Sequence, residues 1–111
     1  MTRVYLATDR SGLAQLHAAG ALPADTERVV APDEDEDSEY DALMTAAALS
    51  AGRGGRGGRR VVVVAELARA DDPVALDDVV AVHCDTADRP ADADPDDDLA
   101  WFATQEIADL M

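Results

Sequence analysis

The chain lacks lysine altogether and contains one cysteine and only four aromatic residues among its 111 positions. Because Cys84 has no second cysteine to pair with, an intramolecular disulfide framework is excluded. The shortage of aromatic side chains leaves alanine and valine to fill the core, which must therefore be thin and closely packed. The opening residues lack the apolar run of a signal peptide, and no stretch approaches the roughly 18 apolar residues of a membrane span. We expect a soluble, cytoplasmic protein with no membrane partner.

Positive charge is also scarce. The nine cationic side chains are all arginine. The chain has 24 aspartates and glutamates, so its formal net charge is −15. Such a charge repels nucleic acid, so we expect no nucleic-acid partner. An acidic surface can also imitate DNA towards a basic protein, which leaves an acidic DNA mimic as one alternative, although a solvated acidic face is the simpler interpretation. GC-rich coding and salt adaptation both account for this composition.

The hydrophobic pattern predicts a single acidic α/β domain over residues 1–111. The run RRVVVVAEL at 59–67 is apolar enough to be buried on both faces, which indicates a sheet covered by helices on both sides. We expect a layered sandwich with a mixed sheet of about four strands and three helices, in the order β-α-β-α-β-β-α. The predicted strands are residues 3–7, 27–32, 59–67 and 79–86.

Helix starts are predicted from capping residues and from apolar spacing. The expected starts are Asp9 or Ser11 for the first helix, Ser38 for the second, and Asp94 with Pro95 for a third that runs to the C-terminus. In the second helix the side chains that recur at helical spacing, and so form its expected buried face, are Tyr40, Leu43, Met44, Ala47 and Ala51. In the strand at 79–86 we expect Val80, Val82 and Cys84 to point one way.

Residues 51–60, AGRGGRGGRR, hold four of the nine arginines. They are either an RNA-binding tract or the connection between a helix and a strand. An RNA-binding tract would carry more repeats and aromatic residues, and would not be attached to so acidic a body. We therefore interpret the tract 51–60 as a replaceable connection with a flexible segment at 52–58, and we expect its arginines to lie against the protein's own acidic loops. The polar stretch 87–95 is predicted to be a second flexible segment.

Five segments occur in a recognisable order: RVYLAT, EYDAL, RRVVVVAEL, AVHCD and WFATQEI. Together they resemble a family of uncharacterised actinobacterial proteins that begin with an RVYLPAT-like strand and end with a W-[YF]-A-T-Q-E helix. The chain departs from that pattern in two places, because no proline follows Leu6 and the middle is shorter, with the glycine–arginine tract in its place. The resemblance implies a lineage and a domain of unknown function, and it implies no chemistry.

We predict neither a metal site nor a cofactor. His83 and Cys84 are adjacent on a strand, so their side chains point to opposite faces and cannot readily chelate one ion. The acidic runs that begin at Asp33 and Asp92 lack both the glycine at the sixth position and the glutamate at the twelfth that a calcium-binding EF-hand loop requires. No nucleophile motif is present, and we assign no catalytic residue.

The last helix gives the only unusual pattern. Projecting residues 99–111 at 3.6 residues per turn places Glu106 among apolar side chains and Trp101 on the opposite side. A buried carboxylate needs a partner, and the simpler interpretation is that Glu106 pairs with an arginine or that the terminal turn frays. Trp101 either packs under the acidic linker or belongs to a subunit or partner interface, where an exposed tryptophan is typical.

Two hypotheses of different classes follow from this pattern. The preferred one is a cytoplasmic protein-interaction module that binds itself or another protein through the final helix, with Trp101, Thr104, Gln105 and Glu106 as the binding residues. The alternative is a small enzyme or ligand-binding protein whose pocket gathers Glu106, Gln105, Tyr40 and His83. In that alternative Glu106 is the candidate acid or base or ligand acceptor, and Tyr40, His83 and Gln105 orient the substrate.

Overall fold

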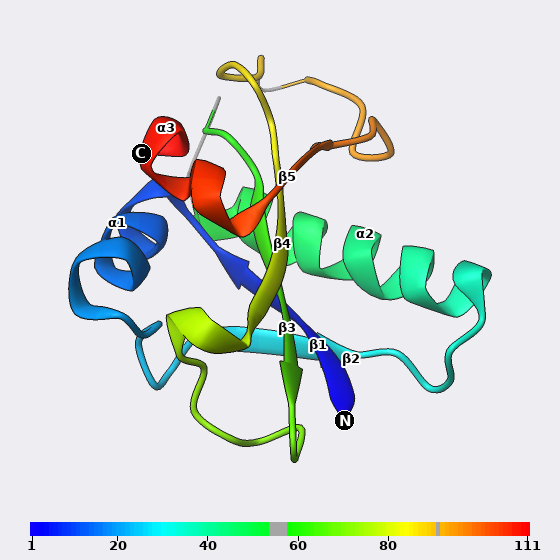
Figure 1. Ribbon diagram of the computed structural model, residues 1–111. Helices are drawn as coiled ribbons and strands as arrows, with labels where there is room; N and C mark the ends of the chain where they lie inside the picture. The colour runs from blue at the N-terminus through cyan, green and yellow to red at the C-terminus, as the bar shows by residue number, and fades with distance from the viewer. Residues whose placement is uncertain (54–57, 91) are drawn as a thin grey trace.

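A computed structural model of the chain describes residues 1–53, 58–90 and 92–111 (Figure 1). Five strands form one sheet in the order β2-β1-β3-β4-β5. The strands are β1 (Thr2–Thr8), β2 (Glu27–Val30), β3 (Val61–Leu67), β4 (Val79–Cys84) and β5 (Ala100–Phe102). The helices are α1 (Arg10–Ala19), α2 (Glu36–Arg53) and α3 (Ile107–Leu110), with 3₁₀ turns η1 (Leu76–Asp78) and η2 (Thr104–Glu106).

The α/β architecture and its three helices are confirmed. The sheet differs in two respects from the mixed sheet of about four strands that the sequence predicts. It has five strands in the described residues, because residues 100–102 form β5, and all four strand pairings are antiparallel.

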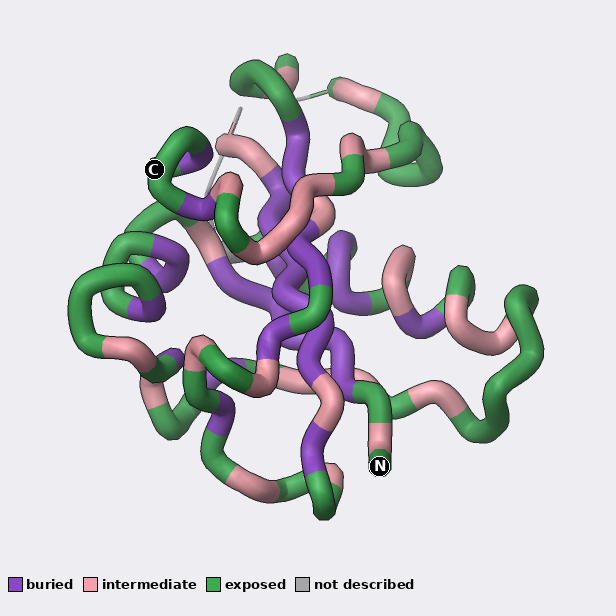
Figure 2. The backbone as a smooth tube through the Cα atoms, in the orientation of Figure 1, coloured by how far each residue is buried: buried purple, intermediate pink, exposed green. Residues whose placement is uncertain are grey.

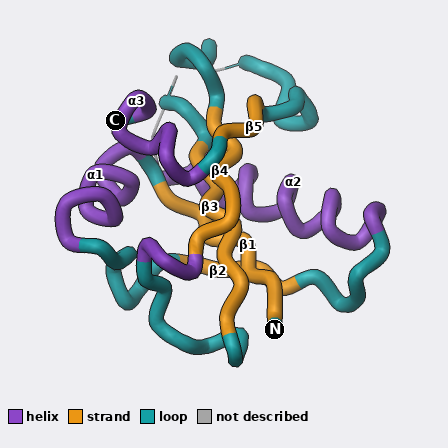
Figure 3. The backbone as a smooth tube through the Cα atoms, viewed as in Figure 1, coloured by secondary structure: helices purple, strands orange, loops and turns teal. Residues whose placement is uncertain are grey.

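The sheet carries helices on both faces, with α1 and α3 on one side and α2 on the other (Figure 3). The central strand β3 is buried at every position except Glu66, which explains its continuous valine run (Figure 2). Val61 and Val63 contact the cluster under α1 and α3, whereas Val62 and Val64 contact the cluster under α2. Each valine therefore contributes to one of two thin cores, as the alternation of side chains along a strand requires.

The buried face of α2 is built from small side chains. Ala42, Ala46 and Ala47 are buried against the sheet, whereas Tyr40 is 48% exposed. The prediction that Tyr40 belongs to the buried face is therefore wrong. Small residues allow the helix backbone to approach the valine-rich sheet closely, and a tyrosine at the contact would hold the two apart.

Ser50 ties α2 to two strands. Its hydroxyl donates to the carbonyl oxygen of Thr8 at 2.6 Å and accepts from the backbone N–H of Val61 at 2.8 Å. Ser50 is fully buried, so both hydrogen bonds lie inside the protein. They fix the end of α2 against β1 and β3.

Asp9 is the N-cap of α1 and accepts from the backbone N–H of Gly12 at 2.8 Å, which decides between the two predicted caps. Gly12 is required for the approach of α1 to β1, because a Cβ atom there would lie 1.8 Å from Oγ1 of Thr8. Gly20 ends the helix in the left-handed conformation (φ 76°), which favours glycine.

The predicted final helix from Pro95 to the C-terminus is wrong. Residues 99–102 alternate instead, since Leu99 packs against the α2 cluster and Phe102 against the opposite one. This period of two suits a strand, and pairing with β4 satisfies backbone groups that the edge of β4 would otherwise leave unpaired. The chain becomes helical only at η2 and α3.

β4 contains an irregularity that the sequence pattern did not reveal. The register between β3 and β4 shifts at Val64/Ala65, so Val80 falls outside the paired residues and is 41% exposed. Val82 and Cys84 point the same way, as predicted, and face the α1 and α3 side, but Val80 does not join them in the core. Across the described part of the chain, no helix combines the length and the apolar character that crossing a membrane requires.

Candidate functional site

The most exposed aromatic side chain belongs to the edge of the sheet. Trp101 is the middle residue of β5, pairs with His83 of β4, and is 61% exposed. β5 is the last strand of the sheet, and within the described residues no strand pairs with its outer edge. A large apolar side chain therefore lies directly beside unpaired strand backbone.

His83 is half-buried on the face of the sheet that α2 covers, opposite Val62 of β3. Burial lowers the pKa of His83 below the usual value of about 6.5, so the imidazole is neutral at pH 7. A neutral ring beside Trp101 contributes a flat, weakly polar surface and no charge.

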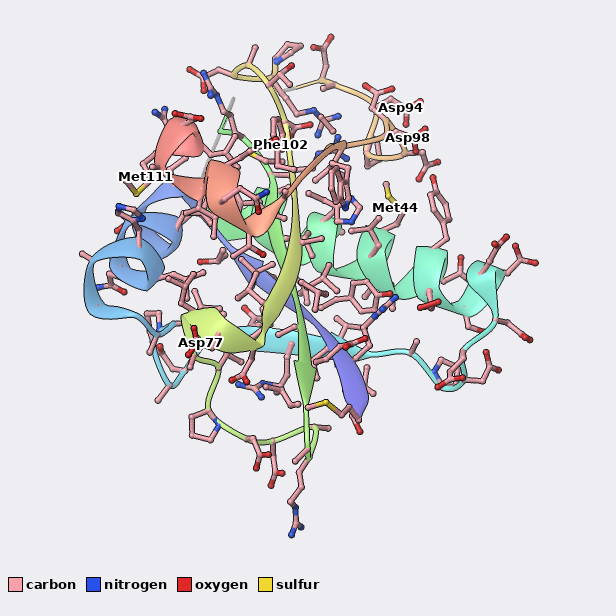
Figure 4. All side chains as sticks on the ribbon, viewed as in Figure 1. Met44, Asp77, Asp94, Asp98, Phe102 and Met111 are labelled. Carbon is pink, nitrogen blue, oxygen red and sulfur yellow. The ribbon has the colours of Figure 1, made fainter. Side chains whose placement is uncertain are left out.

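Tyr40 connects α2 to the acidic segment that precedes β5. Its hydroxyl donates to Oδ1 of Asp98 at 3.0 Å. This hydrogen bond to Asp98 raises the pKa of Tyr40, so the phenol stays protonated and remains a donor. Met44, one helical turn further along α2, lies on the side of that helix nearest Asp98 (Figure 4).

We call the area formed by Trp101, His83, Tyr40, Met44 and Asp98 the Trp101 surface. Acidic residues of two stretches lie near the Tyr40 hydroxyl: Asp41 of residues 33–41 at the start of α2, and Asp96 and Asp98 of residues 92–98 before β5. They are far apart in sequence and are brought together by the Tyr40–Asp98 hydrogen bond. Exposed aromatic rings thus lie within a strongly negative area.

The segment before β5 is anchored by a buried ion pair. Arg60 is 1% exposed, and its Nε and Nη2 donate to the two carboxylate oxygens of Asp85 at 2.9 Å and 2.8 Å. The Arg60 backbone N–H donates to the same carboxylate at 2.8 Å, and Nη1 donates to the carbonyl oxygen of Pro95 at 3.2 Å. The end of the glycine–arginine tract is therefore a structural anchor.

Two further arginines contact aspartates of the chain between β4 and β5. Nε of Arg59 lies 3.5 Å from Asp88, and Arg89 contacts Asp97 at 3.4 Å. The prediction that arginines of the tract lie against the protein's own acidic loops is thus confirmed for Arg59 and Arg60. The predicted link at 52–58 lies largely in residues 54–57, outside the described residues.

Asp85 is the centre of this group of charges. Burial raises the pKa of Asp85, but hydrogen bonds from Arg60 and the nearby charges of Arg60 and Arg89 outweigh that effect, so the net pKa is lowered. Sequence reasoning missed this pair. The signal for it was the pairing of Val61 with Cys84, which places the residues just outside both strands, Arg60 and Asp85, opposite each other.

The remaining predicted residues lie on the other side of the sheet. Gln105 lines a shallow hollow of about 490 Å³ together with His17 of α1 and Asp77 of η1. Thr104 lines the same hollow and donates its hydroxyl proton to the carbonyl oxygen of Val79 at 3.0 Å. The structure therefore brings Thr104 and Gln105 together but places them away from the Trp101 surface.

Glu106 ends η2 and is half-buried, but the helical stripe that singled it out does not exist. The four residues of the predicted pocket do not share one face, since Tyr40 and His83 lie on the α2 side and Gln105 on the α1 side. Within the described ranges, no group of three or more histidine, cysteine, aspartate or glutamate side chains is arranged to hold a metal ion.

A second hollow, of about 520 Å³, is lined by Arg3 near the N-terminus. The Arg3 guanidinium already donates to Glu39 at 3.1 Å and to Glu66 at 2.8 Å. Hydrogen bonding to Glu66 raises the pKa of Arg3, which stays charged and paired. The Arg3 guanidinium in this hollow is therefore already paired and is not free to receive an anionic ligand.

A family profile matches residues 2–111, which is almost the whole chain. The chain belongs to DUF6912, a family of unknown function. No curated protein and no solved structure matches it. Family membership confirms the resemblance to an uncharacterised domain family and assigns no activity to any residue.

Proposed function

We propose that the protein is a protein-interaction module whose binding surface is the Trp101 surface. The observation that carries this proposal is the 61% exposure of Trp101 on an edge strand, beside the half-buried His83. Tryptophan is enriched among residues that dominate binding energy, because burial of its ring removes a large apolar area from water. The hydrogen-bonded position of Tyr40 supplies a second aromatic side chain for the same partner.

The partner we propose is another protein and not a second copy of this chain. Two copies that each carry a formal net charge of −15 repel one another, and their acidic stretches would meet at the interface. A partner with basic residues would be attracted instead. We place the interaction in a cytoplasm, because a single buried cysteine suits a reducing compartment, and in an actinobacterial cell, because the sequence resemblance implies that source.

A pocket enzyme is less well supported. The candidate acid or base Glu106 follows Gln105 in η2, whereas Tyr40 and His83 lie on the face covered by α2. An acid or base must come within hydrogen-bond reach, about 3 Å, of the atom it serves. Residues on opposite faces of a sheet do not meet that requirement.

Site-specific photocrosslinking in the source cell tests the proposal. A benzoylphenylalanine at position 101 should form a discrete adduct with another protein. The matched control carries the same photoreactive group at Val30, which is 43% exposed on the opposite edge strand β2 and should give no such adduct. The proposal fails if both positions give the same adducts, or if position 101 gives none.

A further inference from the structure

We infer that the partner presents an extended, arginine-containing segment that pairs with the free edge of β5 as a sixth strand. This inference rests on the proposed function and specifies the chemistry of the occupant. Addition of a strand to an open sheet edge supplies backbone hydrogen bonds, and alternate side chains supply specificity.

The edge of β5 carries neither lysine nor proline, and only the shortness of the strand protects it. Exposed sheet edges are commonly guarded by lysine, by proline or by a covering element, which prevents pairing with other chains. β5 contains only Ala100, Trp101 and Phe102, and among the described residues no strand pairs with its outer side. The opposite edge strand β2 is different, because Pro32 follows it closely and limits its extension.

β5 is short, so backbone pairing alone would hold a partner weakly and side chains must contribute. In an added strand, every second residue faces the α2 side of the sheet, where Trp101 lies. An arginine at that position can stack its planar guanidinium on the exposed indole. The same guanidinium then lies near the carboxylates that precede β5, and Asp96 and Asp98 are both exposed.

Arginine fits this surface better than lysine. Its guanidinium can stack on an aromatic face and can also form two parallel hydrogen bonds to one carboxylate. Trp101 offers the aromatic face, and the segment 92–98 contains five aspartates. Lysine would provide the charge without the planar geometry.

The charge of the protein selects among the chains that an open edge could accept. A second copy brings a net charge of −15, and nucleic acid brings phosphates, so both are repelled. A cationic strand is attracted by the same carboxylates. The acidic segment therefore protects β5 from self-pairing and leaves it open to a basic segment.

The surface is also held in place before binding. Arg60 holds the chain between β4 and β5 at two points, the Asp85 carboxylate and the carbonyl of Pro95. Tyr40 holds Asp98 from the side of α2. Because these contacts already order the segment, a partner pays little conformational entropy to bind it.

A titration with a defined peptide tests the inference. The probe is the peptide Arg-Thr-Arg-Val-Arg-Thr-Arg, and the signal is the emission of Trp101, the only tryptophan in the chain. We expect saturable binding at about 0.15 M NaCl. The same peptide with N-methyl groups on alternate backbone nitrogens keeps its charge but loses donors to β5, and its affinity should fall about tenfold or more. A lysine version should bind more weakly than the arginine version.

Matched variants test the role of the acidic segment by calorimetry. Asp96→Asn/Asp98→Asn should weaken binding about tenfold and reduce its dependence on salt. The control Asp71→Asn/Asp109→Asn removes the same charge from exposed positions elsewhere and should change the affinity less than about twofold. Trp101→Leu should also weaken binding. Its NMR spectrum should still show the dispersed β5 amide signals of a folded strand.

The results separate the inference from the proposed function. Equal binding of the N-methylated and unmodified peptides, or equal loss in both double variants, would show diffuse charge attraction and would overturn the inference. Failure of every peptide while position 101 still forms its protein adduct would overturn the basic-strand occupant and leave the interaction module standing. Self-association through β5, seen by sedimentation and removed by Trp101→Leu, would assign the edge to a second copy and would also overturn the inference.

Discussion

The buried pair of Arg60 and Asp85 is the residue-scale feature with the largest expected effect on stability. Asp85→Asn leaves the Arg60 guanidinium in the core, 1% exposed, without the carboxylate that it is hydrogen-bonded to. Breaking a buried ion pair in this way costs about 3 kcal/mol or more of unfolding free energy. Urea unfolding at pH 7 measures the loss. The control Asp71→Asn breaks an exposed pair with Arg69 and should change stability by less than about 0.5 kcal/mol; equal effects of the two substitutions would contradict the assignment.

The same pair predicts a dependence on acid. Although burial raises the pKa of Asp85, its bonds to Arg60 bring the net value below the ordinary 3.8. A carboxyl group with a lowered folded-state pKa stabilises the fold above its unfolded-state pKa, and that stability is lost as the pH falls through the folded-state value. The stability difference between the wild type and Asp85→Asn should therefore shrink as the pH falls below 3.8. A constant difference down to the acid limit would argue against the ion pair.

His83 predicts a pH effect in a milder range. Burial lowers its pKa in the folded state below 6.5, so the unfolded chain takes up the proton first. The stabilisation from a neutral His83 is complete above 6.5 and is lost as the pH falls from there towards the folded-state pKa. Urea unfolding of the wild type should thus show stability falling between about pH 7 and pH 5, and His83→Gln should reduce that fall. An equal fall in the wild type and in His83→Gln would refute this role for His83.

At the scale of elements, the sequence was most informative where one local pattern decides the structure. The valine run of β3 predicts a strand buried on both faces, and the candidate caps Asp9 and Ser11 predict the start of α1, where Asp9 is the cap. The final segment was not predictable in this way. Phe102 and Leu99 fit helical spacing as well as strand alternation, and pairing with β4, a long-range contact, decides between them.

The candidate site shows the same division. Trp101 is exposed as the sequence predicts, but on a strand edge and not on a helix. Its separation from Gln105 follows from the turn between β5 and η2, which no periodicity reveals. Arg60 belongs to the predicted strand 59–67, but only the register of β3 and β4 places it beside Asp85. Long-range pairing, more than local preference, assembled what sequence reasoning missed.

The close contact of α2 with the sheet gives a prediction for that element. Ala46 is fully buried between the helix and the strands, and Ala46→Leu would force the two apart. Overpacking of this kind should lower the free energy of unfolding by about 1–3 kcal/mol. Ala48→Leu places the same side chain on the exposed side of α2 and should change stability by less than about 0.5 kcal/mol, as surface substitutions usually do. Thermal unfolding of both variants makes the comparison. If Ala46→Leu does not lower the stability, α2 is free to shift away from the sheet.

The whole molecule is dominated by its net charge of −15, which makes salt a stabilising agent. The fold brings Asp41 of the acidic stretch 33–41 close to Asp96 and Asp98 of the stretch 92–98 at the Tyr40–Asp98 contact, whereas the unfolded chain separates them. Salt screens such exposed repulsion within a Debye length of about 10 Å at 0.1 M, but it screens the buried Arg60–Asp85 pair far less. The free energy of unfolding should therefore rise with NaCl by on the order of 1 kcal/mol between low and physiological salt.

Asp41→Asn/Asp96→Asn removes one carboxylate from each stretch, so it should be more stable than the wild type at low salt and gain less from added NaCl. Stability that falls with salt would mean that exposed ion pairs, such as those of Arg3, outweigh the repulsion between the acidic stretches.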